Sequence, residues 1–390
     1  MRNFTFQNTT KIYFGNTVLN ELGQELSKYG KNVLLAYGGG SIKKIGLYDK
    51  VIKELEKANL NVFELSGIEP NPRHTTVNKG AKICKEKNID VVLAVGGGST
   101  IDCAKVITAA RYYDGDAWDL VIGKAKIEKT LPLVTVLTLS ATGSEMDIWA
   151  VISNLETNEK IGVGDALMLP KASFLNPENT YSVNAYQTAC GSVDIMAHIF
   201  DVFYFTMQPK MEMILNITEE ILKSIVKFAP IAIQEPNNYE ARENLMWAST
   251  WALNDFLDDG TKQAATTHAI EHELSAFYDI THGHGLAIVI PRWLNYILDE
   301  QNAPIIKRLG VNVFNIDKNL SNIEGAKATI AAIEKFYFKD LGLESKLSNL
   351  GITDKDFKLM AEKLCGKDGT IGTFKALKAK DVEEILKLCL

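Results

Sequence analysis

The stretch Asp90–Lys105, DVVLAVGGGSTIDCAK, joins an apolar run to a glycine triplet and then to a helical segment. Its first part, Asp90–Val95, has the length and the β-branched content of a buried strand. The three glycines that follow allow the backbone to turn sharply and to approach a ligand too closely for any Cβ. The helix expected from Thr100 onward directs free N–H groups at this turn, and a pyrophosphate suits such a position.

Strand-like and helical segments alternate on both sides of this stretch. Strand-like runs lie at residues 11–14, 32–37 and 61–65 and in LPLVTVLTLSATGSEM from Leu131, and helical patterns lie at 47–58 and 75–87. Residues 149–154 and 160–163 have the pattern of a hairpin. Alternation of this kind is typical of βαβ units, so we predict an α/β domain over residues 1–184, with a Rossmann-like parallel sheet.

Helical periodicity replaces the alternation beyond about Tyr186. Helices are expected at residues 194–205, 211–228, 239–256, 266–278, 284–298, 325–341, 354–364 and 379–388. The segment 176–184, which contains proline and asparagine, is the expected joint. We therefore predict an all-helical second domain over residues 185–390.

Composition limits the cellular context and the partners. The chain has 390 residues, a net charge of −6 and no basic cluster, which argues against nucleic-acid binding. No run of about eighteen apolar residues and no signal-like start occur, so we expect a cytoplasmic protein that does not enter membranes. Its five cysteines are odd in number and scattered, which fits reduced thiols rather than a disulfide framework.

Histidines and an aspartate in the second half suggest a metal site. Asp194 and His198 lie four residues apart in an apolar helical run, so both side chains share one helix face. The simpler interpretation is a local hydrogen-bonded pair, but a buried aspartate is costly unless it is paired or binds a metal. His-Glu-x-x-His chemistry is excluded because Ala276 stands where its second histidine would be. The residues alone do not choose the remaining ligands among His268, His272, His282 and His284.

A second glycine triplet, followed by Ser41, ends the strand-like run at 32–37. Two such turns at the carboxyl ends of parallel strands, where ligands of open α/β sheets bind, favour a dinucleotide over a pair of tight turns. No acid follows the first triplet directly, and Lys43 and Lys44 lie nearby. This uncharged turn with two lysines favours a 2′-phosphate, so NADP(H) is expected over NAD(H). Hydroxyls of Thr138 and Ser140, in the turn that ends the strand-like run from Leu131, could contact ribose or phosphate.

The chain resembles the iron-containing, or group III, alcohol dehydrogenases, which share a dehydroquinate-synthase-like fold. It is most similar to the butanol dehydrogenase and broad aldehyde reductase branch of this family. The similarity covers almost the whole chain, through KIYFG, AYGGGSIKK, GIEPNPR, LAVGGGSTIDCAK, LTLSATGSEM, GSVDIMAHIFD, YEARENLMWAS and HELSAFYDITHGHGLAI.

The resemblance implies roles for individual residues. The metal ligands would be Asp194, His198, His268 and His282, with His272 as an unligated catalytic neighbour near the nicotinamide. The cofactor-binding residues would be Gly39, Gly40, Ser41, Asn71, Gly96, Gly97, Gly98, Ser99, Asp102, Thr138, Ser140 and Lys160. The metal would be divalent, with iron favoured and zinc as the alternative. The family also suggests a homodimer formed through the first strand.

The expected activity is that of an alcohol dehydrogenase and aldehyde reductase acting on short-chain primary alcohols such as butanol. Hydride would pass between nicotinamide and substrate carbon while the metal polarises the substrate oxygen, in a cleft between the domains. One alternative is a lyase like dehydroquinate synthase, but few basic residues beyond Lys262 and Arg292 lie near the ligands. Another is a non-catalytic dinucleotide sensor, which would not need the histidine cluster. Two departures from the family are the segment 260–267 and the extra His284.

Overall fold

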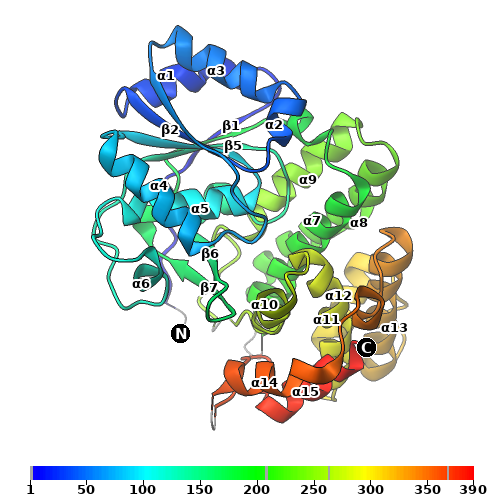
Figure 1. Ribbon diagram of the computed structural model, residues 1–390. Coiled ribbons are helices and arrows are strands. Elements are labelled where there is room, and N and C mark those ends of the chain that lie inside the picture. The colour runs from blue at the N-terminus through cyan, green and yellow to red at the C-terminus, as the bar shows by residue number, and fades with distance from the viewer. Residues whose placement is uncertain (1–2, 207–209, 262–263, 367–368) are drawn as a thin grey trace. The chain divides into compact units, whose positions relative to one another are not determined.

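The computed structural model describes residues 3–206, 210–261, 264–366 and 369–390 (Figure 1). Lys262, one of the few basic residues near the predicted ligands in the sequence, lies outside the described residues. The chain forms two compact units, Gln7–Val183 and Asn184–Leu390, and the N-terminal Met1–Phe6 groups with the second. We describe each unit by itself.

A six-stranded parallel sheet forms the centre of the first unit, in the order β1-β8-β5-β4-β2-β3. The strands are β1 (Lys11–Phe14), β2 (Asn32–Tyr37), β3 (Asn61–Leu65), β4 (Val91–Gly96), β5 (Leu133–Leu137) and β8 (Ala172–Leu175). Because β2, β4 and β5 are neighbours, the turns after them meet at one edge of the sheet. The predicted Rossmann-like sheet is confirmed.

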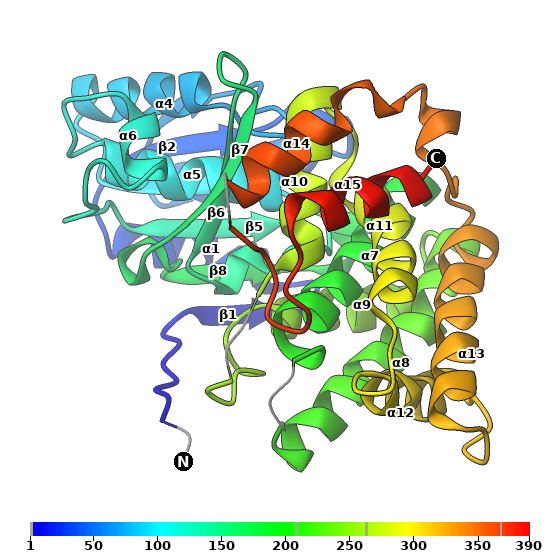
Figure 2. The same cartoon turned by 90° about the horizontal axis from the view of Figure 1, so that it is seen from below.

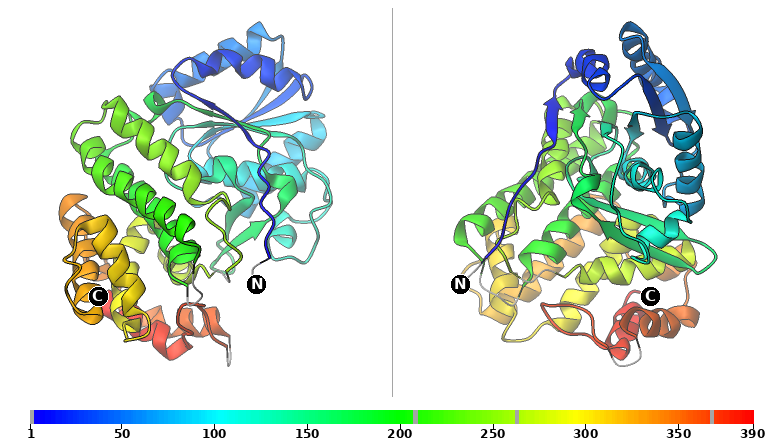
Figure 3. Two further views of the ribbon diagram at one scale, coloured as in Figure 1. Left: turned by 180° about the vertical axis from the view of Figure 1, so that it is seen from behind. Right: turned by 90° about the vertical axis from the view of Figure 1, so that its left-hand side faces the viewer.

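Helices cover both faces of this sheet, as Figures 1 and 3 show. On one face, α1 (Leu22–Ser27) and α3 (Leu47–Lys57) pack on a core built from alternate residues of β2, β4 and β5. On the other face lie α4 (His74–Glu86) and α5 (Gly98–Ala110). The remaining helices, α2 (Ser41–Lys44) and α6 (Ala117–Val121), and the antiparallel hairpin of β6 (Trp149–Asn154) and β7 (Glu159–Gly164) complete the unit.

The second unit is built from helices, as predicted. They are α7 (Ala185–His198), α8 (Glu212–Gln234), α9 (Tyr239–Ala252), α10 (Thr266–Tyr278), α11 (His282–Ile297), α12 (Ala303–Phe314), α13 (Asn322–Lys335), α14 (Phe357–Cys365) and α15 (Ala379–Leu388). One apolar core runs through them, and Figure 2 shows α12 and α13 packed beside each other, as are α14 and α15. Among the described residues, no helix combines the length and apolar character needed to cross a membrane.

Several element bounds differ from the sequence predictions. The helix expected from residue 194 begins at Ala185, because Asn184 caps it by accepting a hydrogen bond from the Gln187 N–H at 2.8 Å. The helix expected from residue 284 begins at His282, so this histidine lies on a helix rather than in a loop. Strand β8 and helix α12 were not predicted.

All five cysteines are buried and free. Burial raises the pKa of the Cys84, Cys190 and Cys389 thiols to about 12. These side chains therefore act as small apolar residues in the two cores.

Candidate functional site

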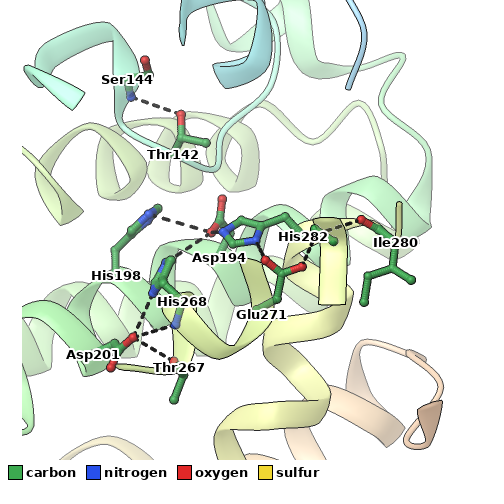
Figure 4. A network of polar contacts seen from close by, with 11 residues as sticks. Thr142, Ser144, Asp194, His198, Asp201, Thr267, His268, Glu271, Ile280 and His282 are labelled. Carbon is green, nitrogen blue, oxygen red and sulfur yellow. Dashed lines mark hydrogen bonds and ion pairs between the residues drawn. The ribbon is translucent and has the colours of Figure 1, made fainter. Parts of the chain in front are cut away.

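Three helices of the second unit bring the predicted metal ligands together (Figure 4). Helix α7 carries Asp194 and His198 one turn apart, and both are buried. Helix α10 carries His268, and α11 begins with His282. Residues separated by about ninety positions in the sequence thus surround one carboxylate.

The imidazoles point the same ring atom at the same oxygen. The distances from Asp194 Oδ1 to Nε2 are 3.9 Å for His198, 4.0 Å for His268 and 3.6 Å for His282. Ligand atoms about 2.1 Å from a tetrahedral ion would be separated by about 3.4 Å. The spacing therefore fits atoms that gather around one divalent ion.

Burial supports this interpretation of the cluster. Ligand atoms of Asp194, His268 and His282 all lie within 4.8 Å of one another, while His198 approaches Asp194 from the other side in Figure 4 and stacks on His268. Within the described part of the chain, His268 Nε2 is buried without a hydrogen-bond partner. Since buried polar atoms are normally satisfied, this nitrogen fits a metal ligand.

Two further carboxylates hold the rings in place. Asp201 Oδ2 accepts a hydrogen bond from His268 Nδ1 at 3.0 Å, and Glu271 Oε2 contacts His282 Nδ1. Sequence reasoning missed both residues. The available signal was spacing, because Asp201 follows Asp194 by seven residues and Glu271 follows His268 by three, which are helical intervals.

The histidines differ in how easily they take up a proton. Burial, with the charges of His268 and His282, lowers the pKa of His198 well below its usual range. Burial alone would also lower the pKa of His268, but the hydrogen bond and charge of Asp201, with the charges of Asp194 and Glu271, raise it. His198 is therefore a neutral imidazole at pH 7, the form that binds metal ions.

The two other histidines of this region, His272 and His284, lie in different surroundings. Both ring nitrogens of His284 are engaged, Nδ1 with the Tyr186 hydroxyl at 3.1 Å and Nε2 with the Glu344 carbonyl at 2.9 Å. His272 is partly exposed, and its ring centroid lies 5.3 Å from that of His282. The geometry therefore favours His282 over His284 beside Asp194 and places His272 next to the cluster.

A close backbone approach fixes α11 against α7. A Cβ on Gly283 would lie 2.1 Å from the carbonyl oxygen of Cys190, which real contacts do not allow. Cys190 precedes Asp194 by one helical turn, and Gly283 follows His282 directly. The absence of a side chain at position 283 thus sets how near His282 comes to Asp194.

In the first unit, close packing accounts for the glycines of the second triplet. A Cβ would come within 2.4 Å of the Thr100 side chain at Gly96 and of the Thr142 side chain at Gly98, and within 3.0 Å of Leu139 at Gly97. The turn between β4 and α5 is therefore packed tightly against neighbouring side chains.

The hydroxyl and the backbone N–H of Ser99 have different surroundings. The Ser99 hydroxyl donates to the Pro70 carbonyl. Its N–H belongs to the first turn of α5, where no earlier carbonyl of the helix is available. Thr138 and Ser140 follow β5 at the same sheet edge, since the Thr138 N–H donates to the Gly96 carbonyl at 3.1 Å.

Asp102 organises the neighbouring loops. Its carboxylate accepts hydrogen bonds from the Ser144 hydroxyl at 2.6 Å and from the Val151 N–H of β6 at 2.9 Å. Burial raises the pKa of Asp102, and the charge of Lys105 and, less strongly, that of the buried Lys160 on β7 oppose this rise. Asp102 thus ties the hairpin that carries Lys160 to α5, directly after the second glycine triplet.

The first triplet is more open than the second. No heavy atom of the described chain would lie within 4 Å of a Cβ at Gly39 or Gly40, although Gly40 has a φ of +97°. Ser41, at the start of α2, is exposed, and Asn71 is partly buried after β3.

An unpredicted polar cluster lies beside this turn. Glu64 accepts hydrogen bonds from the hydroxyls of Tyr37 and Tyr48, both at 2.6 Å, and these bonds lower its pKa. The Lys43 ammonium lies 4.0 Å from Glu64 Oε2 and 4.4 Å from the centre of the Tyr48 ring. An acid thus stands near the turn, supplied by the neighbouring strand and invisible to local sequence motifs.

Comparison with known proteins identifies relatives along the whole chain. Residues 9–177 match the model of iron-containing alcohol dehydrogenases, and residues 188–390 match the C-terminal model of that family. The chain is 49% identical over 388 residues to NADH-dependent butanol dehydrogenase A of Clostridium acetobutylicum, covering 99% of each. It is 36% identical over 367 residues to an NADPH-dependent aldehyde reductase of Escherichia coli, covering 93% of each.

A solved structure supports the same relationship. The crystal structure of NADH-dependent butanol dehydrogenase A from Thermotoga maritima superimposes with a TM-score of 0.94 at 38% identity, covering 100% of this chain and 99% of the other. The fold and these relatives define an NAD(P)-dependent oxidoreductase. More particularly, the chain belongs to the iron-containing alcohol dehydrogenase family, which confirms the predicted resemblance.

Replacing Gly283 by alanine should disturb the cluster without touching a predicted ligand. The added Cβ must push α11 away from Cys190, so we expect a destabilisation of about 1–3 kcal/mol and loss of divalent ion retention. Metal analysis and thermal unfolding of the purified protein measure both effects. Gly162→Ala is the control, since its Cβ would meet only Val151 at 3.9 Å. Wild-type ion retention in Gly283→Ala would contradict this account of the helix contact.

Proposed function

We propose that the protein interconverts short-chain aldehydes and primary alcohols such as butanol, with a divalent metal, iron by preference, and NADP(H). The observation that carries the proposal is the convergence of three imidazole Nε2 atoms on Asp194 Oδ1 in a chain of this family. The names of its relatives, butanol dehydrogenases and an aldehyde reductase, support the substrate class.

Asp194, His198, His268 and His282 would hold the metal. Three neutral imidazoles and one carboxylate leave a divalent ion with net positive charge, able to act as a Lewis acid on a substrate oxygen. Burial of Asp194 and His268 keeps water away from this part of the site. His282 is the more accessible ligand, with 22% of its side chain exposed.

The dinucleotide would be held at the carboxyl edge of the parallel sheet. The N–H groups at the start of α5 suit a pyrophosphate, and hydroxyls of Thr138 and Ser140 suit the ribose or phosphates. Lys160, whose charge acts on Asp102, would add positive charge to this binding site. A bound nicotinamide supplies or accepts the hydride.

His272 is proposed to move a proton between the substrate and solvent. Its partial exposure gives it access to water, and its ring lies beside those of His268 and His282. An imidazole suits this role because its pKa lies near neutral pH.

The proposed preference for NADP(H) depends on the turn after β2, because relatives are named for either cofactor. The nearby acid, Glu64, accepts hydrogen bonds from two tyrosine hydroxyls, and its Oε2 lies 4.0 Å from the Lys43 ammonium. Lys43 is half exposed and follows Gly40 by three residues, so its ammonium can pair with a 2′-phosphate.

We expect butanal-dependent oxidation of NADPH, faster than that of NADH, by protein loaded anaerobically with ferrous iron. Chelation should abolish turnover, and added ferrous iron should restore it, because the substrate oxygen then regains its Lewis acid. Absorbance at the reduced nicotinamide band follows both cofactors in parallel. Turnover that survives complete chelation would contradict the metal proposal. Oxidation of NADH that is faster than that of NADPH would contradict the proposed cofactor preference.

Replacing His272 by alanine should lower kcat by roughly 100-fold or more while the bound metal stays stoichiometric, because a proton relay contributes that much. The pH profile of kcat should change shape. Metal analysis separates this outcome from loss of a ligand, for which Asp194→Ala serves as the comparison. Full turnover with an unaltered pH profile would exclude the relay.

Two substitutions beside the first turn should shift cofactor preference in opposite directions. Lys43→Met should weaken NADPH binding roughly tenfold with little effect on NADH, because a charge-assisted contact is lost. Glu64→Gln should strengthen NADPH binding by releasing Lys43. Fluorescence titration of both reduced cofactors measures the constants, and Lys57→Met, which removes a lysine paired with Glu54 on α3, is the control. Equal changes for NADH and NADPH would contradict the role of Lys43.

A further inference from the structure

Three hydrogen bonds converge on one oxygen of Asp201. Asp201 lies in the π-helical turn Ile199–Tyr204 that follows His198, and only 1% of its side chain is exposed. One oxygen, Oδ2, accepts hydrogen bonds from the Thr267 hydroxyl at 2.9 Å, the His268 N–H at 2.9 Å and His268 Nδ1 at 3.0 Å. The carboxylate therefore binds both the backbone N–H and the ring of His268.

The contact with Nδ1 decides which nitrogen of His268 can bind a metal. A carboxylate oxygen only accepts hydrogen bonds, so Nδ1 must carry the proton. Nε2 is then the nitrogen with the free electron pair, and it faces Asp194 Oδ1 at 4.0 Å. Asp201 thus fixes both the tautomer and the direction of the ring.

Glu271 repeats this arrangement on the third ring. Its Oε2 contacts His282 Nδ1, its Oε1 accepts from the Ser275 hydroxyl, and its side chain is fully buried. His282 Nε2 then faces the same Asp194 oxygen at 3.6 Å. Two different helices therefore supply the same kind of contact to two different imidazoles.

We propose that Asp201 and Glu271 are positioning residues that hold His268 and His282 in the Nδ1–H tautomer, with Nε2 presented to a divalent cation. The proposal rests on the metal centre of the proposed function and adds a supporting pair that controls how tightly it binds the ion. Carboxylates behind ligand imidazoles raise ligand basicity, and losing one typically weakens metal binding 10- to 100-fold.

A purely structural role for Asp201 is the competing explanation, because its bonds to Thr267 and the His268 N–H also cap the start of α10. The Asp201→Asn substitution separates the two roles. The amide oxygen can take the place of Oδ2 and still accept from the backbone N–H, but the residue loses the negative charge that raises the basicity of Nε2. Thr267→Val removes one bond to the same carboxylate and leaves the ring contact, so it is the matched control.

The experiment measures zinc affinity of the full-length protein by competition with a chelating dye. Asp201→Asn and Glu271→Gln should each weaken zinc binding by roughly 10- to 100-fold, whereas Thr267→Val should stay within about threefold. Fluorescence titration with NADPH shows whether each variant keeps a folded dinucleotide unit. Nitrogen-15 NMR of histidine-labelled protein reports the tautomer directly, and we expect Nδ1–H for His268 and His282 in the wild type.

The outcomes distinguish this proposal from the proposed function. If Asp194→Ala bound zinc as tightly as the wild type, that result would overturn the metal centre itself. Zinc binding that depends on Asp194 but is unchanged in both carboxamide variants would overturn only the positioning role. Should a variant fail to bind NADPH, the wild-type spectra decide, because Nε2–H tautomers at His268 and His282 contradict the proposal.

Discussion

A carboxylate buried among imidazoles is the constraint on which the helical unit depends. Moving Asp194 out of water is costly unless positive charge or donors lie close by, and its Oδ1 has three imidazole nitrogens within 4.0 Å. Because these rings come from α7, α10 and α11, the packing of three helices is tied to one charged group. The contact between Gly283 and Cys190 lets α11 come near enough to take part.

Buried acids organise the parallel-sheet unit in a comparable way. Asp102 joins α5 to the turn at Ser144 and to β6, while Lys105, fully buried in the same helix, donates to Asp147 at 2.6 Å and to the Trp149 carbonyl. Helix α5 is therefore anchored through polar side chains as well as through its apolar ones. This anchoring holds the turn between β4 and α5 in place relative to the hairpin of β6 and β7.

Much of this architecture follows from local sequence pattern. The alternation of strands and helices predicted the parallel sheet, and the predicted helix Thr266–Tyr278 has the observed bounds, because its apolar spacing is regular and unbroken. Gly283 and Gly285 obscured the start of α11, since glycine is a poor helix former. Asp201 and Glu271 could not be paired with their histidines in advance, because those contacts depend on how separate helices pack. Likewise, Glu64 meets Tyr37 only through strand pairing.

The two glycine turns of the sheet differ in how much change they tolerate. The turn at Gly96–Gly98 is enclosed by Thr100, Leu139 and Thr142, whereas around Gly39 the described chain leaves open space. Substitutions can therefore accumulate at the first turn, whereas at the second turn an added side chain would clash with its neighbours. On the proposed placement of the cofactor, a lineage with this scaffold can exchange one nicotinamide cofactor for the other by substitutions at the more open turn, without disturbing the helices that carry the histidines.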